Sequence, residues 1–234
     1  MKAIVLQARL DSTRLPEKAL LPLDGKPFLL RVMEALNNIS ADLKILTCPE
    51  DSLKEFTPIT KEAGFEIFSG PKEDVLERYR QVVSHFSLNR VIRATGDNPF
   101  VFTDAASLIN TEALSLNADY AGYTGLPYGA GVESVSAAAL LRAADEAALP
   151  SEREHVCPYL YNNPEKFNLH RPAAPQQWLF PDIRLTVDTQ EDYEKAVELY
   201  SALKNEPDRY LGHTIIKVYS RIGYANKYSN SSGC

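Results

Sequence analysis

The first 120 residues alternate between short apolar runs and longer segments of helical character, and this rhythm restricts the fold more than any other feature. The expected strands are residues 2–8, 43–48, 66–68, 90–94 and 119–123, and the expected helices are 27–36, 49–63, 73–86 and 103–116. Strands that alternate with helices at this spacing form a mainly parallel sheet with helices on both faces. We therefore predict an α/β fold of three layers.

The rhythm loosens after residue 124, where segments containing Gly and Pro are more frequent. We expect helices at 137–148, 152–161 and 189–203, strands at 167–171 and 183–187, and a last helix at 213–220. This half is expected to determine which substrate the protein accepts. One domain, residues 1–225, fits the length, because α/β folds of roughly 200–250 residues are routinely single domains. Residues 226–234 are small and polar, which predicts a frayed tail.

Charge and hydropathy exclude several classes of protein. There are 25 Lys and Arg against 31 Asp and Glu, a net charge of −6, and neither half is basic enough to be a nucleic-acid platform. The apolar run after Met1 is too short for a signal peptide, and no apolar run could span a bilayer. The three cysteines follow no metal or disulfide pattern. We expect a cytoplasmic protein without nucleic-acid or membrane partners.

The loop after the first strand, residues 9–26, is rich in cations. Arg9, Arg14, Lys18 and Lys26 are interspersed with Ser12 and other donors suited to anionic oxygens. The loop matches neither the P-loop pattern nor G-x-G-x-x-G, so a polyphosphate would be held in another way. A solvated basic loop is the alternative.

Two carboxylates follow expected strands, where ligands bind in open parallel sheets. Asp97 lies in a Gly-Asp-Asn-Pro segment, which by itself is more often a turn. Asp188 could instead cap the next helix, with Glu191 three residues on. Together with a basic loop, the pair favours nucleotidyl transfer, because Mg²⁺ binds through one or two carboxylates plus phosphate oxygens.

The stretch ARLDSTRLPEKALLPLDGKP, which ends at Pro27, closely resembles the N-terminal signature of cytidylyltransferases that activate sugar acids, notably the 3-deoxy-manno-octulosonate and acylneuraminate enzymes. Further similar motifs follow in order over nearly the whole chain: FSG with DVLERY, GDNP, PYG with Glu133, REH, and VDT with ED. The chain looks most similar to the branch named for spore-coat polysaccharide biosynthesis protein F.

The resemblance implies a Rossmann-like fold of the nucleotide-diphosphosugar transferase type, with a small dimerisation and specificity insertion, in a homodimer. It implies catalytic roles for Arg14, Lys18 and Asp97, and Mg²⁺ held by Asp97 and Asp188. The nucleotide contacts expected from it are Gln7, Ala8, Arg9, Ser12, Arg14, Lys18, Arg78, Thr95 and Gly96. The sugar contacts expected are Gly129, Glu133, Arg153 and His155. The alternative for Gly129 and Glu133 is an ordinary turn, and for Arg153 and His155 a solvated surface helix.

The function implied is transfer of CMP from CTP to a hydroxyl of an acidic sugar, with release of pyrophosphate, for surface polysaccharide or glycoconjugate biosynthesis. Where the octulosonate enzymes have Gln-Gly-Asp-Glu-Pro, this chain has Thr95-Gly96-Asp97-Asn98-Pro99, so the choice of cytosine rests on the resemblance. Two alternatives stay open: a glycosyltransferase that uses a nucleotide-sugar, and a non-catalytic nucleotide-binding module.

Overall fold

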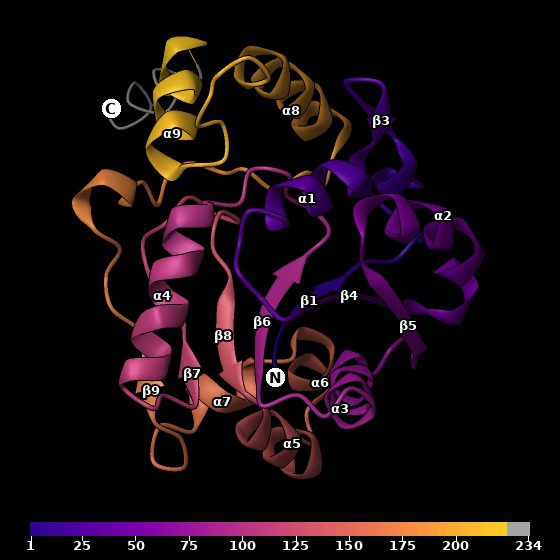
Figure 1. The fold of residues 1–234 in the computed structure, drawn as a ribbon, viewed down its shortest axis with the longest axis vertical. Coiled ribbons are helices and arrows are strands. Elements are labelled where there is room, and N and C mark those ends of the chain that lie inside the picture. Colours follow the sequence, from indigo (N-terminus) through magenta and orange to yellow (C-terminus); the bar gives the residue numbers. More distant parts are fainter. Residues whose placement is uncertain (224–234) are drawn as a thin grey trace, which may run out of the picture.

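A seven-stranded sheet with strand order β5-β4-β1-β6-β8-β7-β9 forms the centre of the protein in a computed structural model that describes residues 1–223 (Figure 1). Four strands pair in parallel: β1 (Lys2–Gln7), β4 (Leu43–Pro49), β5 (Glu66–Gly70) and β6 (Arg90–Thr95). β8 (Glu133–Ser136) pairs antiparallel with both β6 and β7 (Tyr120–Ala121), and β9 (Leu169–His170) is parallel to β7. The predicted mainly parallel sheet is therefore confirmed.

Helices cover both faces of this sheet and create two separate cores. One core holds residues from α1 (Phe28–Leu36), α2 (Leu53–Ala63), α4 (Thr103–Ser115), α8 (Gln190–Leu203) and α9 (Gly212–Arg221). The other holds residues from α3 (Val75–His85), α5 (Ala137–Glu146) and α7 (Pro158–Asn162), and α6 (Pro150–His155) packs against α3. In Figure 1, α8 and α9 lie at the top and α5 lies at the bottom.

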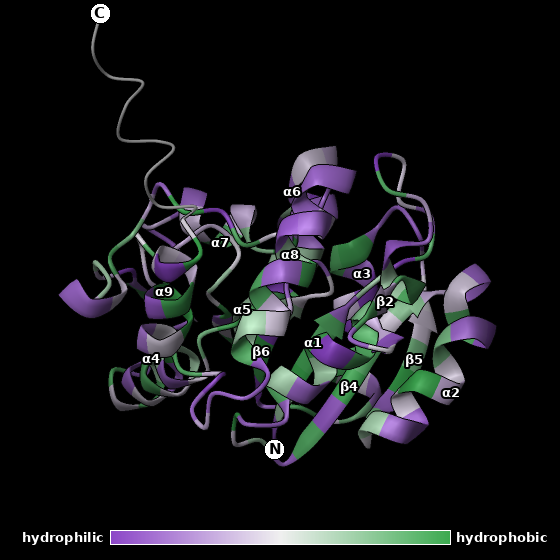
Figure 2. Ribbon diagram, turned by 90° about the horizontal axis from the view of Figure 1, so that it is seen from above, coloured by the Kyte–Doolittle hydropathy of each residue, from purple (hydrophilic) through white to green (hydrophobic). Residues whose placement is uncertain are grey.

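Strand β1 shows why the sheet is buried on both faces. Ile4 and Leu6 contribute to the first core, whereas Ala3 and Val5 contribute to the second. Alternate residues of a strand point to opposite faces, so a continuous apolar run serves two helical layers at once. Figure 2 shows hydrophobic residues along β4 and β6 inside the molecule and hydrophilic ones on the outlying α6.

The long loop after β1 contains structure that the sequence analysis did not anticipate. A short 3-10 turn (Lys18–Leu20) leads to a two-stranded hairpin of β2 (Pro22–Leu23) and β3 (Lys26–Pro27). Arg31 of α1 donates hydrogen bonds to the Leu23 carbonyl at 2.9 Å and the Asp24 carbonyl at 2.5 Å. The hairpin is thereby fixed to the helix that follows it.

Three segments of the second half have a secondary structure that differs from the expectation. Residues 133–136 form a strand that was not predicted, because ESVS lacks an apolar alternation and is recruited by pairing with β6. Residues 183–187 form no strand and make only an isolated bridge from Arg184 to Tyr128. The helix expected at 152–161 is divided into α6 and α7, because Val156 has a positive φ of 73°.

Among the described residues, no helix is long and apolar enough to cross a membrane. The predicted polar tail, 226–234, lies outside the described residues. Cys48 and Cys157 are buried and free, as expected of structural cysteines.

Candidate active site

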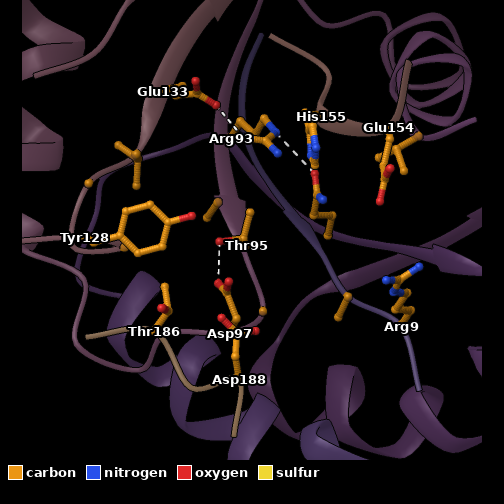
Figure 3. A pocket seen from close by; sticks show the side chains of 18 of the residues that line it. Arg9, Arg93, Thr95, Asp97, Tyr128, Glu133, Glu154, His155, Thr186 and Asp188 are labelled. Carbon is orange, nitrogen blue, oxygen red and sulfur yellow. Dashed lines mark hydrogen bonds and ion pairs between the residues drawn. The ribbon is translucent and has the colours of Figure 1, made fainter. Parts of the chain in front are cut away.

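A cavity of about 720 Å³ opens beyond the carboxyl ends of β1 and β6 (Figure 3). It is bounded by the loop after β1, the start of α3, the segment after β6, and residues that precede α8. With the exception of Arg153, every residue expected at the site lines this cavity: Gln7, Ala8, Arg9, Ser12, Arg14, Lys18, Arg78, Thr95, Gly96, Asp97, Gly129, Glu133, His155 and Asp188.

Asp97 is held by the way β6 ends against β1. The amide of Gly96 donates to the Gln7 carbonyl at 2.8 Å. A Cβ on Gly96 would lie 2.9 Å from the Ala8 Cβ and 3.1 Å from the Gln7 carbonyl oxygen, so only glycine permits this approach. The Thr95 hydroxyl then donates to Asp97 Oδ1 at 2.5 Å, which directs the carboxylate into the cavity.

Asp188 reaches the same cavity on a neighbouring segment. The amide of Val187 donates to the Asp97 carbonyl at 2.8 Å and joins the two backbones. The alternative in which Asp188 caps α8 is wrong, because Thr189 is the N-cap and forms a capping box with Asp192. The Asp188 carboxylate is thus available for charge pairing in the cavity.

Three cations converge on the Asp188 carboxylate. Arg14 Nη2 lies 3.1 Å and Lys18 Nζ 3.4 Å from its Oδ1, while Arg184 pairs with its Oδ2. Lys18 is only 13% exposed and also donates to the Val187 carbonyl at 2.5 Å. Lys18 is therefore fixed in the cavity wall and does not behave as the lysine of a solvated loop would. The Arg14 side chain, by contrast, is 65% exposed at the mouth of the cavity.

The middle of the same loop is anchored by Lys72, which also lines the cavity and which the sequence analysis did not select. Its ammonium pairs with Asp11 at 2.7 Å and with Asp51 at 2.8 Å. The hydrogen bonds that its ammonium donates to Asp11, the larger effect, and to Asp51 raise the pKa of Lys72 above its usual value. These contacts tie the basic loop to the segments that follow β4 and β5.

Arg78 of α3 is a buried cation without a carboxylate partner among the described residues. It is 3% exposed, its Nη1 donates to the Pro71 carbonyl at 2.8 Å, and its Nε has no partner. Burial lowers the pKa of Arg78. Because an unpaired buried charge is costly, a guanidinium at a cavity wall favours a ligand that supplies hydrogen-bond acceptors.

On the opposite side, Glu133 lies beside a residue that the sequence analysis missed. Arg93 is its cross-strand partner between β6 and β8, and its Nη1 pairs with Glu133 Oε2. Burial opposes the charge of Arg93, but the interactions with Glu133, together with smaller ones from Cys157 and Tyr79, outweigh it, so the pKa of Arg93 is raised. The signal available in the sequence was an arginine inside a strand, between the apolar Ile92 and Ala94.

Gly129 brings a loop close to the segment before Asp188. It has a φ of +93°, and a Cβ there would lie 2.4 Å from Thr186 Cγ2. Its carbonyl accepts from Asn98 Nδ2 at 2.7 Å, which ties it to the segment after β6. Thr186 and the largely exposed Tyr128, also in the cavity wall, were not selected from the sequence.

Arg153 requires a correction. Its Nε pairs with Asp74 Oδ2 at 2.6 Å, and its Nη1 donates to the carbonyls of Ala144 at 3.0 Å and Ala147 at 2.9 Å. These contacts hold α6 against α3 and the end of α5, and Arg153 does not line the cavity. We therefore remove it from the candidate sugar contacts, because its donors are used in packing helices.

The two aspartates form an oxygen-only donor set. Within residues 1–223 no group of three or more His, Cys, Asp or Glu side chains could hold a metal ion, so Asp97 and Asp188 would be its only carboxylates. Magnesium needs no more than one or two carboxylates when substrate phosphates and waters complete its coordination. The donors fit Mg²⁺, although a cation there would compete with Arg14, Lys18 and Arg184 for Asp188.

An α/β sheet that ends in a cavity lined by cations and two aspartates is typical of a nucleotidyltransferase of Rossmann-like fold. Residues 3–218 match the model of the cytidylyltransferase family. The chain belongs to that family, which confirms the resemblance noted in the sequence.

Individual relatives agree with this assignment. The chain is 33% identical over 212 residues to spore coat polysaccharide biosynthesis protein SpsF of Bacillus subtilis (strain 168), covering 87% of this chain and 88% of that protein. It is 30% identical over 104 residues to 3-deoxy-manno-octulosonate cytidylyltransferase of Aeromonas hydrophila, covering 42% and 41% of the two chains. The structure of a cytidylyltransferase from Leptospira borgpetersenii superposes with a TM-score of 0.84 at 26% identity, covering 94% of each chain.

Proposed function

We propose that the protein transfers CMP from CTP to a hydroxyl of an acidic sugar, with release of pyrophosphate, in surface polysaccharide or glycoconjugate biosynthesis. The observation that carries this proposal is the meeting of Arg14 and Lys18 with Asp188 beside Asp97. The names of relatives support the acceptor and the pathway, because one concerns a sugar acid and another a spore coat polysaccharide.

The basic loop would act on the leaving group. Arg14 and Lys18 would turn from Asp188 to the β- and γ-phosphate oxygens and stabilise the charge that develops on pyrophosphate. Asp97 and Asp188 would hold Mg²⁺, which when bound supplies charge neutralisation at the phosphates. The remaining work of the chain is to position the acceptor hydroxyl in line with the α-phosphate, and no covalent enzyme intermediate is needed.

Arg78 supports a base with acceptors on its edge. Its side chain lines the cavity, and its guanidinium has no carboxylate partner in the described chain. Cytosine offers two adjacent acceptors, O2 and N3, whereas N3 of uracil carries a proton and would oppose a guanidinium donor. Arg78 in this role would favour CTP over UTP.

The two alternatives are less well supported. A glycosyltransferase would bind a nucleotide diphosphate ester, which needs less neutralisation than the cluster of Arg14, Lys18 and Arg184 provides. A non-catalytic module would have no need of both Asp97 and Asp188 at one cavity.

The deciding experiment measures pyrophosphate release with each of the four nucleoside triphosphates and a panel of sugar acids, against a reaction without acceptor. We expect release only with CTP, Mg²⁺ and a sugar acid together. Release with neutral sugars alone, or transfer of sugar from a nucleotide-sugar without pyrophosphate, would contradict the proposal. The homodimer and the cytoplasmic location stay predictions, to be checked by light scattering and by fractionation.

A further inference from the structure

Arg93 is placed in the cavity by the centre of the sheet. It lies on β6 between β1 and β8, and Glu133 is opposite it in the antiparallel register. Its side chain is 13% exposed, and that exposure is into the cavity (Figure 3). A side chain held by a central strand is placed more rigidly than one on a loop, which suits the recognition of a substrate group.

Glu133 has little capacity left for a sugar. One of its oxygens pairs with Arg93, and the other accepts from the Tyr120 hydroxyl at 2.8 Å. The thiol of Cys157 also contacts this carboxylate. A carboxylate with these partners is suited to orienting Arg93, because its geometry is already determined on both oxygens.

Arg93 itself keeps donors free. Its Nε donates to Gln7 Oε1 at 3.2 Å and its Nη1 to Glu133, while Nη2 has no acceptor within residues 1–223. Nη2 is not sealed in the protein interior, and in Figure 3 the guanidinium lies between Glu133 and His155 at the cavity wall. Arginine presents a planar fork of donors that matches a carboxylate, so this free edge favours an anionic group.

The position along β6 relates this edge to the reacting centre. Arg93 and Thr95 lie on the same face of the strand, roughly 7 Å apart along it, and Thr95 is bonded to Asp97. An acceptor whose acidic group is at Arg93 therefore has the rest of its length on the side of Asp97, where the α-phosphate would be.

We propose that Arg93 binds the carboxylate of the acceptor and that Glu133 is the positioning residue that orients Arg93. The inference rests on the proposed function, since it assumes that the acceptor is a sugar acid. It assigns to Glu133 a role different from a direct contact with sugar hydroxyls. His155 lines the same cavity.

The test is equilibrium binding of matched ligands to the full-length protein saturated with CMP, measured by calorimetry. The probes are 3-deoxy-manno-octulosonate, N-acetylneuraminate and glucuronate, each paired with its carboxamide. We expect the unmodified protein to prefer at least one acid over its amide, and Arg93→Met to weaken binding of that acid by about 10- to 100-fold. Arg93→Lys should keep part of the preference, and Arg142→Met, at an exposed arginine outside the cavity, should keep all of it.

The half-buried Glu133 would lose its charge partner in Arg93→Met, and that variant could unfold. The double variant Arg93→Met with Glu133→Gln, which removes both charges, therefore provides a second measurement. Glu133→Gln alone should change binding of the acids and leave the amides unaffected. If it weakens acids and amides equally, Glu133 contacts the sugar directly and its positioning role is wrong.

The proposal is overturned if Arg93→Met still prefers the acid to its carboxamide. It is also overturned if the unmodified protein binds no acid, or binds each acid no more tightly than its carboxamide. Pyrophosphate release from CTP with a neutral acceptor would instead contradict the acidic-sugar part of the proposed function. CMP affinity is the internal control, because all variants should bind CMP as the unmodified protein does.

Discussion

Lys18 and Asp188 meet across 170 residues of sequence, with Nζ 3.4 Å from the carboxylate and 2.5 Å from the preceding carbonyl of Val187. A cation from the first loop thus closes onto the segment that leads into α8. Because the backbone of that segment is also bonded to Asp97, the loop, the two aspartates and the end of β6 form one connected unit. A change in any of these residues should affect nucleotide chemistry before it affects the fold.

Asp97→Asn and Asp188→Asn should each lower turnover by at least about 10²-fold, because each removes a principal electrostatic group from the cavity. Steady-state rates at saturating Mg²⁺, with thermal unfolding as the check on folding, measure this. Asp145→Asn, at an exposed position on α5, is the matched control and should leave turnover unchanged. A folded Asp97 or Asp188 variant with near-normal Mg²⁺-dependent turnover would disprove the metal assignment for that residue.

In the presence of Mg²⁺, CTP should raise the melting temperature more than ATP, GTP or UTP, because a ligand that binds only the folded state stabilises it by mass action. Differential scanning fluorimetry at equal ligand concentrations measures the four shifts. In Arg78→Met the advantage of CTP over UTP should shrink, since the guanidinium that we propose to donate to the base is gone. Equal shifts for all four nucleotides in the unmodified protein would contradict the cytidine assignment but not the proposed phosphate site.

Arg14→Ala and Lys18→Ala should each weaken CTP binding by about 10- to 150-fold, because each removes a charge-assisted contact to the phosphates. CMP lacks the β- and γ-phosphates, so its affinity should change far less. Calorimetric titration of both ligands gives the comparison, and Lys61→Ala on the exposed side of α2 is the control. Equal losses for CTP and CMP would place these side chains away from the leaving group.

Asp192→Ala should destabilise the protein at neutral pH by about 0.5–2 kcal/mol, as expected for the loss of a helix cap. Its carboxylate accepts from the amides of Asp188 at 3.1 Å and Thr189 at 3.0 Å. Burial opposes its charge, but these amide hydrogen bonds outweigh that effect and lower the pKa of Asp192. A carboxyl whose pKa is lower in the folded state adds stability above its unfolded pKa and loses it as the pH falls through the folded value.

The stability difference between Asp192→Ala and the unmodified protein should therefore narrow as the pH falls below about 4, the ordinary range of an aspartate. Urea unfolding from pH 7 downward follows it. Glu191→Ala changes an exposed acid in the same helical turn and should show a much smaller effect at every pH. A difference that is constant with pH would mean that the Asp192 side chain contributes packing and not charge.

Much of the site could be predicted because its residues lie where local patterns are strong. Asp97 follows a buried strand, and Asp188 precedes a helix whose amphipathic pattern and acidic first turn are clear. The carboxyl ends of parallel strands meet at one edge of a sheet, which accounts for Asp97. Asp188 was placed there at the end of an expected strand, 183–187, that does not form, and it reaches the cavity because the Val187 amide donates to the Asp97 carbonyl. The motif in the basic loop added Arg14 and Lys18, which the resemblance placed at the nucleotide.

The predictions that were wrong concern segments whose structure depends on residues far away in the sequence. Residues 133–136 become a strand only because β6 offers an unpaired edge. Residues 183–187 do not become one, because their only β-pairing in the described chain is the isolated bridge to Tyr128, and Val187 bonds to Asp97 and Lys18 instead. Arg153 belongs to a motif shared with the family, yet Asp74 and two helix-end carbonyls occupy its donors.

The sequence by itself determined the alternation of strands and helices in the first 120 residues, the parallel half of the sheet and the family, because periodicity and turn chemistry are local properties. Only the tertiary structure decided which charges are neighbours. Arg93 acquires its place beside Glu133 through the register of two strands, and Lys18 acquires Asp188 through the folding of a loop over the sheet. Electrostatic and hydrogen-bonding energies depend on distance in space, and no local pattern in the chain specifies that distance.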